Sequence, residues 1–441
     1  MKFYNRTKEL KYLHDIEVDA MTSSRMTVIV GRRRIGKTKL IKEAYEKKVY
    51  LFVSKKNEAL LCEEFIDIIQ NELEIKILGT FSKFKDLFEY LMEVSKTTSF
   101  TLVIDEFQEF LQINHSIYAD MQNIWDSHKD TSKINLILSG SIYSLMKKIF
   151  EDKKEPLFGR ANHKMHLKPF SIFTLQEILQ EHHPNYTNDD LLSFYIFTGG
   201  VAKYVELFVD HRAFTFERQL DVIFDENSLF LDEGKNLLIE EFGKEYTTYF
   251  SILALISSSK TSRSEIESIL EKNVGGYLDR LENEYTIIKK VKPIFAKEGS
   301  RTVKYEIIDN FFHFWFRFIY KNRSAIEIEN YSYIKSIVKR DFNTYSGRFL
   351  EKFFIEKLKL SGKYSNIGTY WERGNQNEID IVAINEDEKN ILIAEVKRNP
   401  EKINLAQLKE KSQKILQKHK KYTVEFKAYA LEDMPLSLNN L

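Results

Sequence analysis

The sequence predicts an α/β fold, with a parallel three-layer sheet at its start and smaller helical and mixed parts after it. Short apolar strands alternate with amphipathic helices over residues 1–168, the pattern of a doubly wound sheet. A glycine-rich loop, residues 31–38, joins the first strand to a helix. A second apolar run, residues 101–104, leads into a pair of carboxylates. Such sheets bind their ligand at the carboxyl edge of the strands.

The glycine-rich loop has the pattern G-x-x-x-x-G-K-T, in which each residue type has a separate task. Gly31 and Gly36 let backbone N–H groups approach phosphate oxygens, and the following helix adds its N-terminal dipole. Lys37 is expected to reach the β- and γ-phosphates of ATP, and the Thr38 hydroxyl to ligate Mg²⁺. The predicted nucleotide-binding residues of this segment are Gly31, Arg32, Arg33, Arg34, Ile35, Gly36, Lys37, Thr38 and Lys39.

The carboxylates after the second apolar run complete a hydrolytic site. Asp105 is expected to hold the water shell of Mg²⁺, and Glu106 to orient and deprotonate an attacking water. A later buried strand, residues 135–140, carries Ser139 near its exit. A hydroxyl there either senses the γ-phosphate or the attacking water, or caps the next helix. The sequence therefore predicts a magnesium-dependent ATPase site.

Two arginines outside the loop have open roles. Arg6, followed by Glu9, either flanks the nucleotide base or begins a solvated helix. Arg160 ends the loop EPLFGR, residues 155–160, and either stabilises charge on the transferring phosphate or lies on the surface. If Arg160 acts on the nucleotide of a neighbouring copy, the active form is a homo-oligomer.

Beyond residue 168 the pattern changes twice. Residues 169–240 carry only helical patterns and are expected to form a helical lid. Residues 241–325 read as three helices and two strands, the order of a winged helix. The basic side chains of this part suit DNA phosphates, unless the domain only bridges its neighbours. They are Lys272, Arg280, Lys289, Lys290, Lys292, Lys297, Arg301 and Lys304.

The last part of the chain, residues 326–441, holds a second set of acidic residues. Alternation along an apolar strand puts Glu395 and Lys397 on one face, where Asp380 from the neighbouring strand and Glu351 from a helix can join them. Carboxylates and a lysine around a hard cation are what phosphodiester hydrolysis requires. Asp380 and Glu395 are the predicted ligands of Mg²⁺ or Mn²⁺, and all four residues form the predicted catalytic set.

Together these motifs resemble the prokaryotic archaeal-type ATPases of the STAND branch of the AAA+-related P-loop proteins. The matching segments are GRRRIGKTKL (31–40), LVIDEFQ (102–108), LILSGS (136–141), PLFGR (156–160), TGGVAKY (198–204) and YEIIDNFFHFWFRFIY (305–320). The resemblance implies a nucleotidase core, a helical lid and a winged helix, often followed by a nuclease-like domain. It supports Arg160 as a catalytic arginine and residues 5–10 as part of base recognition. Ala202 departs from the usual pattern, which has proline there. The Asp…Glu-x-Lys arrangement resembles the PD-(D/E)xK nuclease fold.

Composition excludes several classes of protein. With 66 Lys and Arg against 65 Asp and Glu, the net charge of +1 gives no global attraction to nucleic acid, so local patches must provide any such contact. Cys62 is the single cysteine, which excludes intrachain disulfides and a thiolate zinc cluster. No apolar window suits a signal peptide or a membrane span, so we expect a cytoplasmic protein with no membrane partner.

The sequence thus supports two functional hypotheses. In the first, the nucleotide state of an ATPase controls a metal-dependent deoxyribonuclease domain. In the second, the protein is an ATP-gated regulator or scaffold, whose winged helix binds a partner protein and whose nuclease-like fold is inert.

Overall fold

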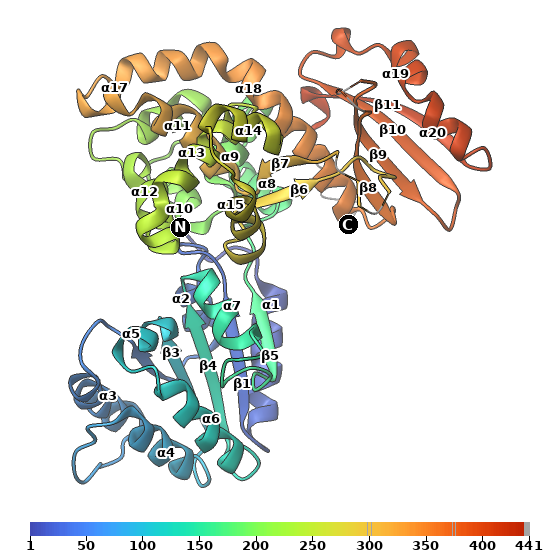
Figure 1. Ribbon diagram of the computed structural model, residues 1–441. Coiled ribbons are helices and arrows are strands. Elements are labelled where there is room, and N and C mark those ends of the chain that lie inside the picture. The colour runs from blue at the N-terminus through green and yellow to red at the C-terminus, as the bar shows by residue number, and fades with distance from the viewer. Residues whose placement is uncertain (298, 301, 373, 375, 436–441) are drawn as a thin grey trace. The chain divides into compact units, whose positions relative to one another are not determined.

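The computed structural model describes residues 1–297, 299–300, 302–372, 374 and 376–435. These residues form two compact units (Figure 1). The first unit is Tyr4–Pro169, and the second combines Met1–Phe3 with the described residues from Phe170 onward.

The first unit contains a five-stranded parallel sheet, which confirms the predicted α/β class. Its strand order is β2-β3-β4-β1-β5, and every neighbouring pair is parallel. The strands are β1 (Arg25–Val30), β2 (Val49–Phe52), β3 (Phe100–Asp105), β4 (Ile134–Gly140) and β5 (His163–His166). The helices are α1 (Thr7–Ala20), α2 (Lys37–Ala44), α3 (Glu58–Leu73), α4 (Phe84–Val94), α5 (Phe110–Ile113), α6 (Ile117–His128) and α7 (Tyr143–Glu151).

The central strands are mainly apolar because both of their faces are covered. Leu102 and Ile104 of β3, with Leu136 and Leu138 of β4, have no exposed surface. Parallel strands are joined by crossover helices that cover the faces of the sheet, so alternation between polar and apolar residues disappears. This is why the two runs are so easily recognised in the sequence.

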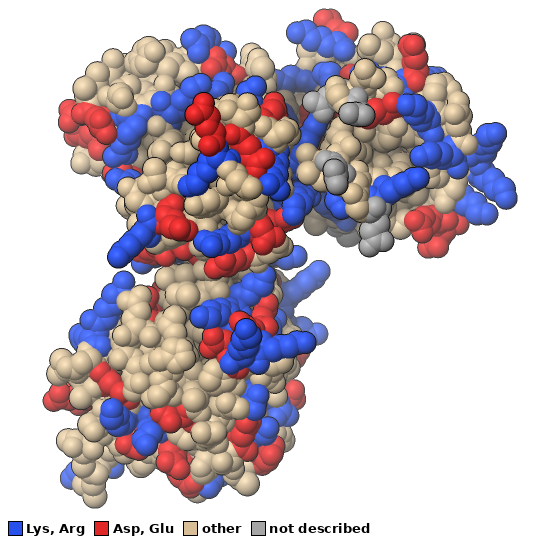
Figure 2. Space-filling view, in the orientation of Figure 1, with Lys and Arg blue, Asp and Glu red and all other residues tan. Residues whose placement is uncertain are grey.

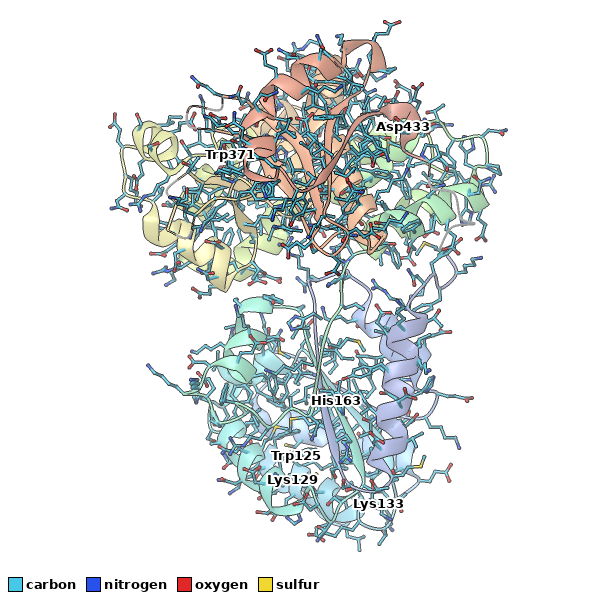
Figure 3. All side chains as sticks on the ribbon, turned by 90° about the vertical axis from the view of Figure 1, so that its right-hand side faces the viewer. Trp125, Lys129, Lys133, His163, Trp371 and Asp433 are labelled. Carbon is cyan, nitrogen blue, oxygen red and sulfur yellow. The ribbon has the colours of Figure 1, made fainter. Side chains whose placement is uncertain are left out.

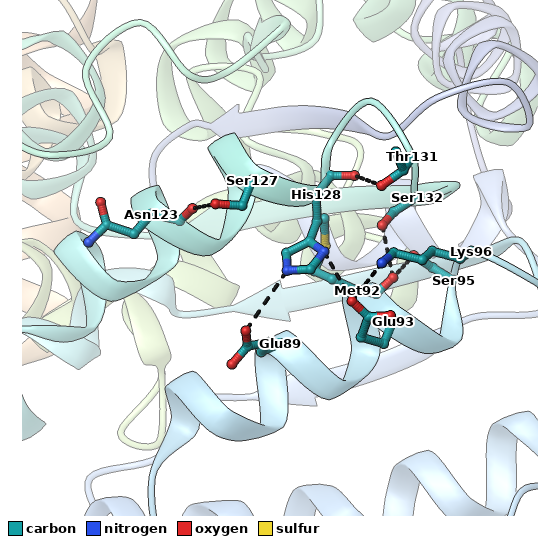
Figure 4. A network of polar contacts seen from close by, with 10 residues as sticks. All are labelled: Glu89, Met92, Glu93, Ser95, Lys96, Asn123, Ser127, His128, Thr131 and Ser132. Atoms are coloured by element: carbon teal, nitrogen blue, oxygen red, sulfur yellow. Dashed lines mark hydrogen bonds and ion pairs between the residues drawn. The ribbon is translucent and has the colours of Figure 1, made fainter.

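A polar network fastens α6 to the end of α4 (Figure 4). The Nδ1 atom of His128 lies 3.2 Å from a carboxylate oxygen of Glu93. The hydroxyls of Ser95 and Ser132 donate hydrogen bonds of 2.8 and 2.9 Å to the carbonyl of Met92. Met92 is in the last turn of α4, whose carbonyls have no partner within the helix. The network therefore satisfies a helix end while positioning the chain that enters β4.

The second unit combines a helical body with two sheets (Figure 1). Its helices are α8 (Ile172–His182), α9 (Asn188–Thr198), α10 (Ala202–Asp210), α11 (Phe216–Ile223), α12 (Leu229–Phe242), α13 (Tyr246–Ser257), α14 (Arg263–Leu270), α15 (Gly275–Asp279), α16 (Asn310–Phe314), α17 (Arg323–Glu327), α18 (Tyr331–Leu360), α19 (Leu405–Lys411) and α20 (Gln413–Lys418). The antiparallel pair is β6 (Ile288–Val291) and β7 (Lys304–Ile307). The four-stranded sheet, in the order β11-β10-β9-β8, contains β8 (Asn366–Tyr370), β9 (Ile379–Asn385), β10 (Asn390–Lys397) and β11 (Thr423–Ala430).

The aromatic segment at residues 311–320 forms the centre of the helical body. The ring centroids of Phe197 and Phe314 are 4.6 Å apart, as are those of Tyr204 and Phe311. The segment contains a π-helical turn, Trp315–Ile319. Its repeated aromatic residues thus join α9 and α10 to one core.

Helix α12, which the sequence pattern did not predict, covers Trp315. The indole Nε1–H donates a 3.1 Å hydrogen bond to the carbonyl of Leu231. Gly234, one turn further along the helix, faces the indole ring so closely that a Cβ atom would lie 2.3 Å from Cδ2 of the ring. The glycine is therefore required by packing and not by backbone conformation.

The four-stranded sheet is attached to the helical body through α18 and through the loop of the β6–β7 pair. The backbone N–H of Ile294, in that loop, donates to the carbonyl of Thr369 on the edge strand β8 at 2.8 Å. The Ile294 side chain belongs to the apolar core of the sheet. At the opposite side, Lys357 of α18 donates to the carbonyl of Asp433 at 2.8 Å. Figure 3 labels Trp371 and Asp433 in this part of the unit.

We expect Gly234→Ala to lower the free energy of unfolding of the second unit by about 1–3 kcal/mol, because the indole ring must move to admit the methyl group. Gly347→Ala is the matched control: this helical glycine has no atom within 4 Å of the added Cβ. The control substitution should raise the free energy of unfolding by about 0.5–1 kcal/mol, because alanine has a higher helix propensity than glycine. Urea titrations of both variants test this, and equal stability for the two would contradict the packing role of Gly234.

Candidate functional site

The carboxyl edge of the parallel sheet brings the predicted ATP-site residues together. Strand β1 ends at the glycine-rich loop, β3 ends with Asp105, and β4 ends just after Ser139. Since the strands are parallel and adjacent, these three ends lie side by side.

Three hydroxyl groups hold the carboxylate of Asp105. Ser139 donates to Oδ1 at 2.7 Å, Thr38 donates to Oδ2 at 3.3 Å, and Tyr50 also donates to Oδ2. Burial, and then the neighbouring Asp105, raise the pKa of the Tyr50 phenol. Thr38 and Asp105 thus place two hard oxygen atoms together, which suits Mg²⁺. Tyr50 was missed by sequence reasoning, because it lies within an ordinary apolar strand.

Glu106 is held in a fixed position beside this carboxylate. Its backbone is in the left-handed region, with φ of 53°, which is uncommon for a residue other than glycine. Ser141 donates to its Oε2 atom at 2.7 Å, and the side-chain amide of Gln108 donates to the same oxygen. Strained backbone and defined partners are features of functional positions. Gln108 lies in the segment LVIDEFQ, although its role was not foreseen.

The glycine-rich loop has the geometry that its residue types require. Gly36 has φ of 98°, a conformation that side chains resist, and a Cβ on Gly31 would lie 3.0 Å from the carbonyl of Leu167. The ammonium of Lys37 donates to the carbonyls of Gly31 and Arg32 at 2.7 and 3.2 Å. Among the other predicted residues, Ile35 is buried, Arg32 and Arg34 are half-buried, and Arg33, Thr38 and Lys39 are exposed.

Arg6 lies near this edge of the sheet. It directly precedes α1, is 7% exposed and donates to Glu9 at 3.0 Å. It also donates to the carbonyl of Lys168 at 2.6 Å. That carbonyl follows β5 by two residues, and Leu167 next to it donates to the carbonyl of Val30, the last residue of β1. Arg6 is therefore fixed beside the start of the glycine-rich loop.

Arg160 lies at the other end of the sheet. It donates to the carboxylate of Asp126 at 3.1 and 3.3 Å. Two residues later, Asn162 donates to the carbonyl of Met26, near the start of β1. Met26 precedes Gly31 by five residues, which is roughly 16 Å along a strand. The structure does not bring Arg160 to the glycine-rich loop of its own chain, because the segment precedes a parallel strand instead of following one.

A second acidic cluster lies on the four-stranded sheet. The pairing of β9 with β10 places Ile381 opposite Ala394, and Asp380 and Glu395 are the next residues of the two strands. The ammonium of Lys397 lies 3.3 Å from an oxygen of each carboxylate. Asp380 also accepts a 2.8 Å hydrogen bond from the backbone N–H of Val396. Within the described part of the chain, the Oε2 atom of Glu395 is buried without a hydrogen-bond partner.

Glu351 of α18 interacts with this cluster through its charge. Removal from water, and then the carboxylate of Asp380, raise the pKa of Glu351 to about 8. Burial also raises the pKa of Asp380. For the described residues, however, no group of three His, Cys, Asp or Glu side chains is arranged to hold a metal ion. The unsatisfied oxygen of Glu395 fits a cation, whereas a third protein ligand is not in place.

Four basic residues of the β6–β7 region form ion pairs. Their ion pairs are Lys289–Glu306 at 3.1 Å, Lys290–Glu282 at 2.6 Å, Arg280–Glu245 at 3.1 Å and Lys304–Glu378 at 2.8 Å. Lys304 also lies 4.6 Å from the ring centroid of Trp371. Arg301 lies outside the described residues. These pairings weaken the expected DNA contact of this region.

Two family models match the chain. Residues 3–208 match a model described as an ATPase domain predominantly from Archaea. Residues 315–415 match one described as "Archaea bacterial proteins of unknown function". Among the helices that the structure describes, none is long and apolar enough to cross a membrane.

One curated relative is similar along most of the chain. The uncharacterized protein MJECL04 of Methanocaldococcus jannaschii is 31% identical over 405 residues, covering 90% of this chain and 87% of that protein. Among solved structures, the Walker-type ATPase PABY2304 of Pyrococcus abyssi covers 71% of this chain and 96% of its own, with a TM-score of 0.54 and 18% identity. At 18% identity, this likeness shows a shared fold alone. The chain therefore belongs to the family of proteins that carry the ATPase domain found predominantly in Archaea.

Proposed function

We propose that this ATPase uses its nucleotide state to control metal-dependent cleavage of DNA by its C-terminal sheet. The binding and hydrolysis of ATP follow from the ATPase domain at residues 3–208. The nuclease step is carried by one observation: a buried carboxylate pair, Asp380 and Glu395, which shares a lysine and retains an unsatisfied oxygen.

The residues of the ATPase unit would have separate roles in ATP hydrolysis. The ammonium of Lys37, which donates to the carbonyls of Gly31 and Arg32 in the loop, would bind the β- and γ-phosphates. Thr38 and Asp105 would hold Mg²⁺, which neutralises phosphate charge when it is bound. Glu106, fixed by Ser141 and Gln108, would accept the proton of the attacking water. Arg6 would bind near the base, and Arg160 would act only on a neighbouring copy.

In the C-terminal sheet, Asp380 and Glu395 would hold a divalent ion that polarises the scissile phosphate. Lys397 would then turn from the carboxylates to the charge that develops on that phosphate. Glu351, whose pKa is raised by burial and by Asp380, would give up a proton to serve as a third ligand when the ion is bound.

We assign the helices α13–α15 with β6 and β7 to a winged helix that bridges domains. The support is the insertion of Ile294 into the core of the C-terminal sheet, together with the ion pairs of the wing lysines. A better candidate for DNA contact is the side of α20, where Lys and Arg side chains gather (Figure 2). The exposed lysines at the end of α20 and directly after it are Lys418, Lys420 and Lys421.

The rival function, an ATP-gated regulator with an inert nuclease-like fold, is favoured by one observation. Among the described residues no three metal-ligating side chains converge. Direct measurement of metal binding and of cleavage separates the two functions.

In the ATPase unit, Lys37→Ala should abolish tight ATP binding, because the phosphate charge loses its lysine. Glu106→Gln should retain ATP binding but lose turnover by about 10²–10⁴-fold, since an amide does not accept the proton. Calorimetric binding and phosphate release measure the two effects. Glu43→Ala, at an exposed residue of the same helix, is the control. Unchanged turnover in Glu106→Gln would assign the base to another residue.

In the C-terminal site, Asp380→Asn should lose both Mn²⁺ binding and plasmid nicking. Lys397→Ala should still bind Mn²⁺, while nicking falls by about 10²–10³-fold, the scale of one preorganised charge. Lys402→Ala, an exposed lysine of the same sheet domain, should behave as the wild type. If the wild-type protein neither binds Mn²⁺ nor nicks DNA, with or without ATP, the regulatory function replaces the nuclease.

For the DNA contact, reversing Lys418, Lys420 and Lys421 to Glu should lower affinity and flatten its dependence on salt, because fewer counterions are released. The paired wing residues are the comparison: Lys289→Glu with Lys290→Glu should change the affinity little. Fluorescence anisotropy over a range of KCl concentrations measures both. A larger loss of affinity in the wing variant would indicate that the winged helix makes the DNA contact.

A further inference from the structure

A polar pocket in the second unit belongs to neither of the sites described above. It has a volume of about 320 Å³ and lies between the end of α13, the π-helical turn that follows α16, and α18. Its lining residues are Ser257, Ser258, Ser259, His313, Arg317, Arg340, Asp341, Thr344, Tyr345 and Arg348. The pocket is thus lined almost entirely by polar and charged side chains.

Positive charge exceeds negative charge in this pocket. Arg340 donates to Asp341 at 2.7 and 3.2 Å, and Arg317 lies 3.9 Å from the same carboxylate. Among the described residues, no carboxylate oxygen lies within 4.0 Å of the third arginine, Arg348. Asp341 is therefore the one carboxylate that lines a pocket with three guanidinium groups, and the excess charge favours an anion.

Arg348 also fixes the protonation of His313. An arginine is only a donor, and its guanidinium lies 2.6 Å from Nε2 of His313, so Nε2 must accept this hydrogen bond. The ring is then neutral, with its proton on Nδ1, which lies 3.2 Å from the hydroxyl of Tyr345. Burial and the charge of Arg348 agree with this, since they lower the pKa of His313.

The neutral histidine leaves the tyrosine able to donate. Because the Nδ1–H of His313 donates to Tyr345, the hydroxyl proton of Tyr345 is available to a further acceptor. Ser258 and Ser259, which follow the last residue of α13, add two hydroxyls at the wall of the pocket. Guanidinium groups and hydroxyls in one cavity are the donors that bind phosphate oxygens.

We propose that this pocket binds the phosphate group of a small phosphorylated molecule, of the size of a nucleoside monophosphate. The volume supports an organic moiety beside the phosphate, since pockets for small molecules begin at about 300 Å³. The guanidinium groups of Arg317, Arg340 and Arg348 would bind the phosphate oxygens, and the rings of His313 and Tyr345 would contact the remainder. Such a ligand would join α13 to α18, the helix that also carries Glu351.

The test uses the full-length Lys37→Ala protein, in which the ATP site is disabled, with AMP and inorganic phosphate as probes in calorimetric titrations. Arg348→Gln and Arg340→Gln should each weaken binding by about 10–100-fold, the loss of charge-assisted hydrogen bonds. Arg340 is 71% exposed, so its substitution should not disturb folding. Arg218→Gln, at another exposed arginine, should bind as the parent does.

The two probes distinguish the sources of the phosphate group. Tighter binding of AMP supports a nucleotide-sized ligand, and equal binding of both supports recognition of the phosphate alone. The proposal is overturned if the parent protein binds neither probe, or if Arg340→Gln binds both as tightly as Arg218→Gln does.

Discussion

The hydrogen bonds to Asp105 are the interaction on which the ATPase unit depends. A buried carboxylate is costly unless it is paired or hydrogen-bonded, and here three separate elements supply the donors. Ser139 comes from the end of β4, Tyr50 from β2 and Thr38 from the first turn of α2, directly after the glycine-rich loop. The strands must therefore keep their register for the carboxylate to be satisfied. The same requirement gathers the phosphate-binding loop, the metal-binding oxygens and Glu106 at one edge of the sheet.

In the second unit, helix α18 is the element that connects the other parts. It is a single helix of 30 residues, and successive turns contact different parts of the chain. Arg348 reaches His313 in the aromatic segment, and Lys352 donates to Asn310 at 2.6 Å. Glu351, between them, is close enough to the C-terminal sheet for the carboxylate of Asp380 to disfavour its charged form, which raises the pKa of Glu351.

The structure changes the roles that we infer for several charged residues, but it does not change the predicted α/β fold class. The lysines of the β6–β7 pair looked like a DNA-binding patch, but Lys289 pairs with Glu306 on the opposite strand, and Lys304 pairs with Glu378 of the C-terminal part. Arg160 looked like a catalytic arginine, but it precedes β5 and pairs with Asp126 at the amino end of the sheet. In each case the residue type was informative, and its partner was not visible from its neighbours in the chain.

The sequence by itself determined the features that depend on local chemistry. Apolar runs predicted the buried parallel strands, and the loop was recognisable because Gly36 needs a positive φ and Lys37 must follow it. Only the tertiary structure decided which distant side chains meet. The hydroxyl of Tyr50 at Asp105, the raised pKa of Glu351 and the polar pocket around Arg348 depend on contacts between separate elements. The physical reason is that backbone conformation depends on each residue type and its neighbours in the chain. The removal of a group from water and the formation of ion pairs depend instead on packing across the whole unit.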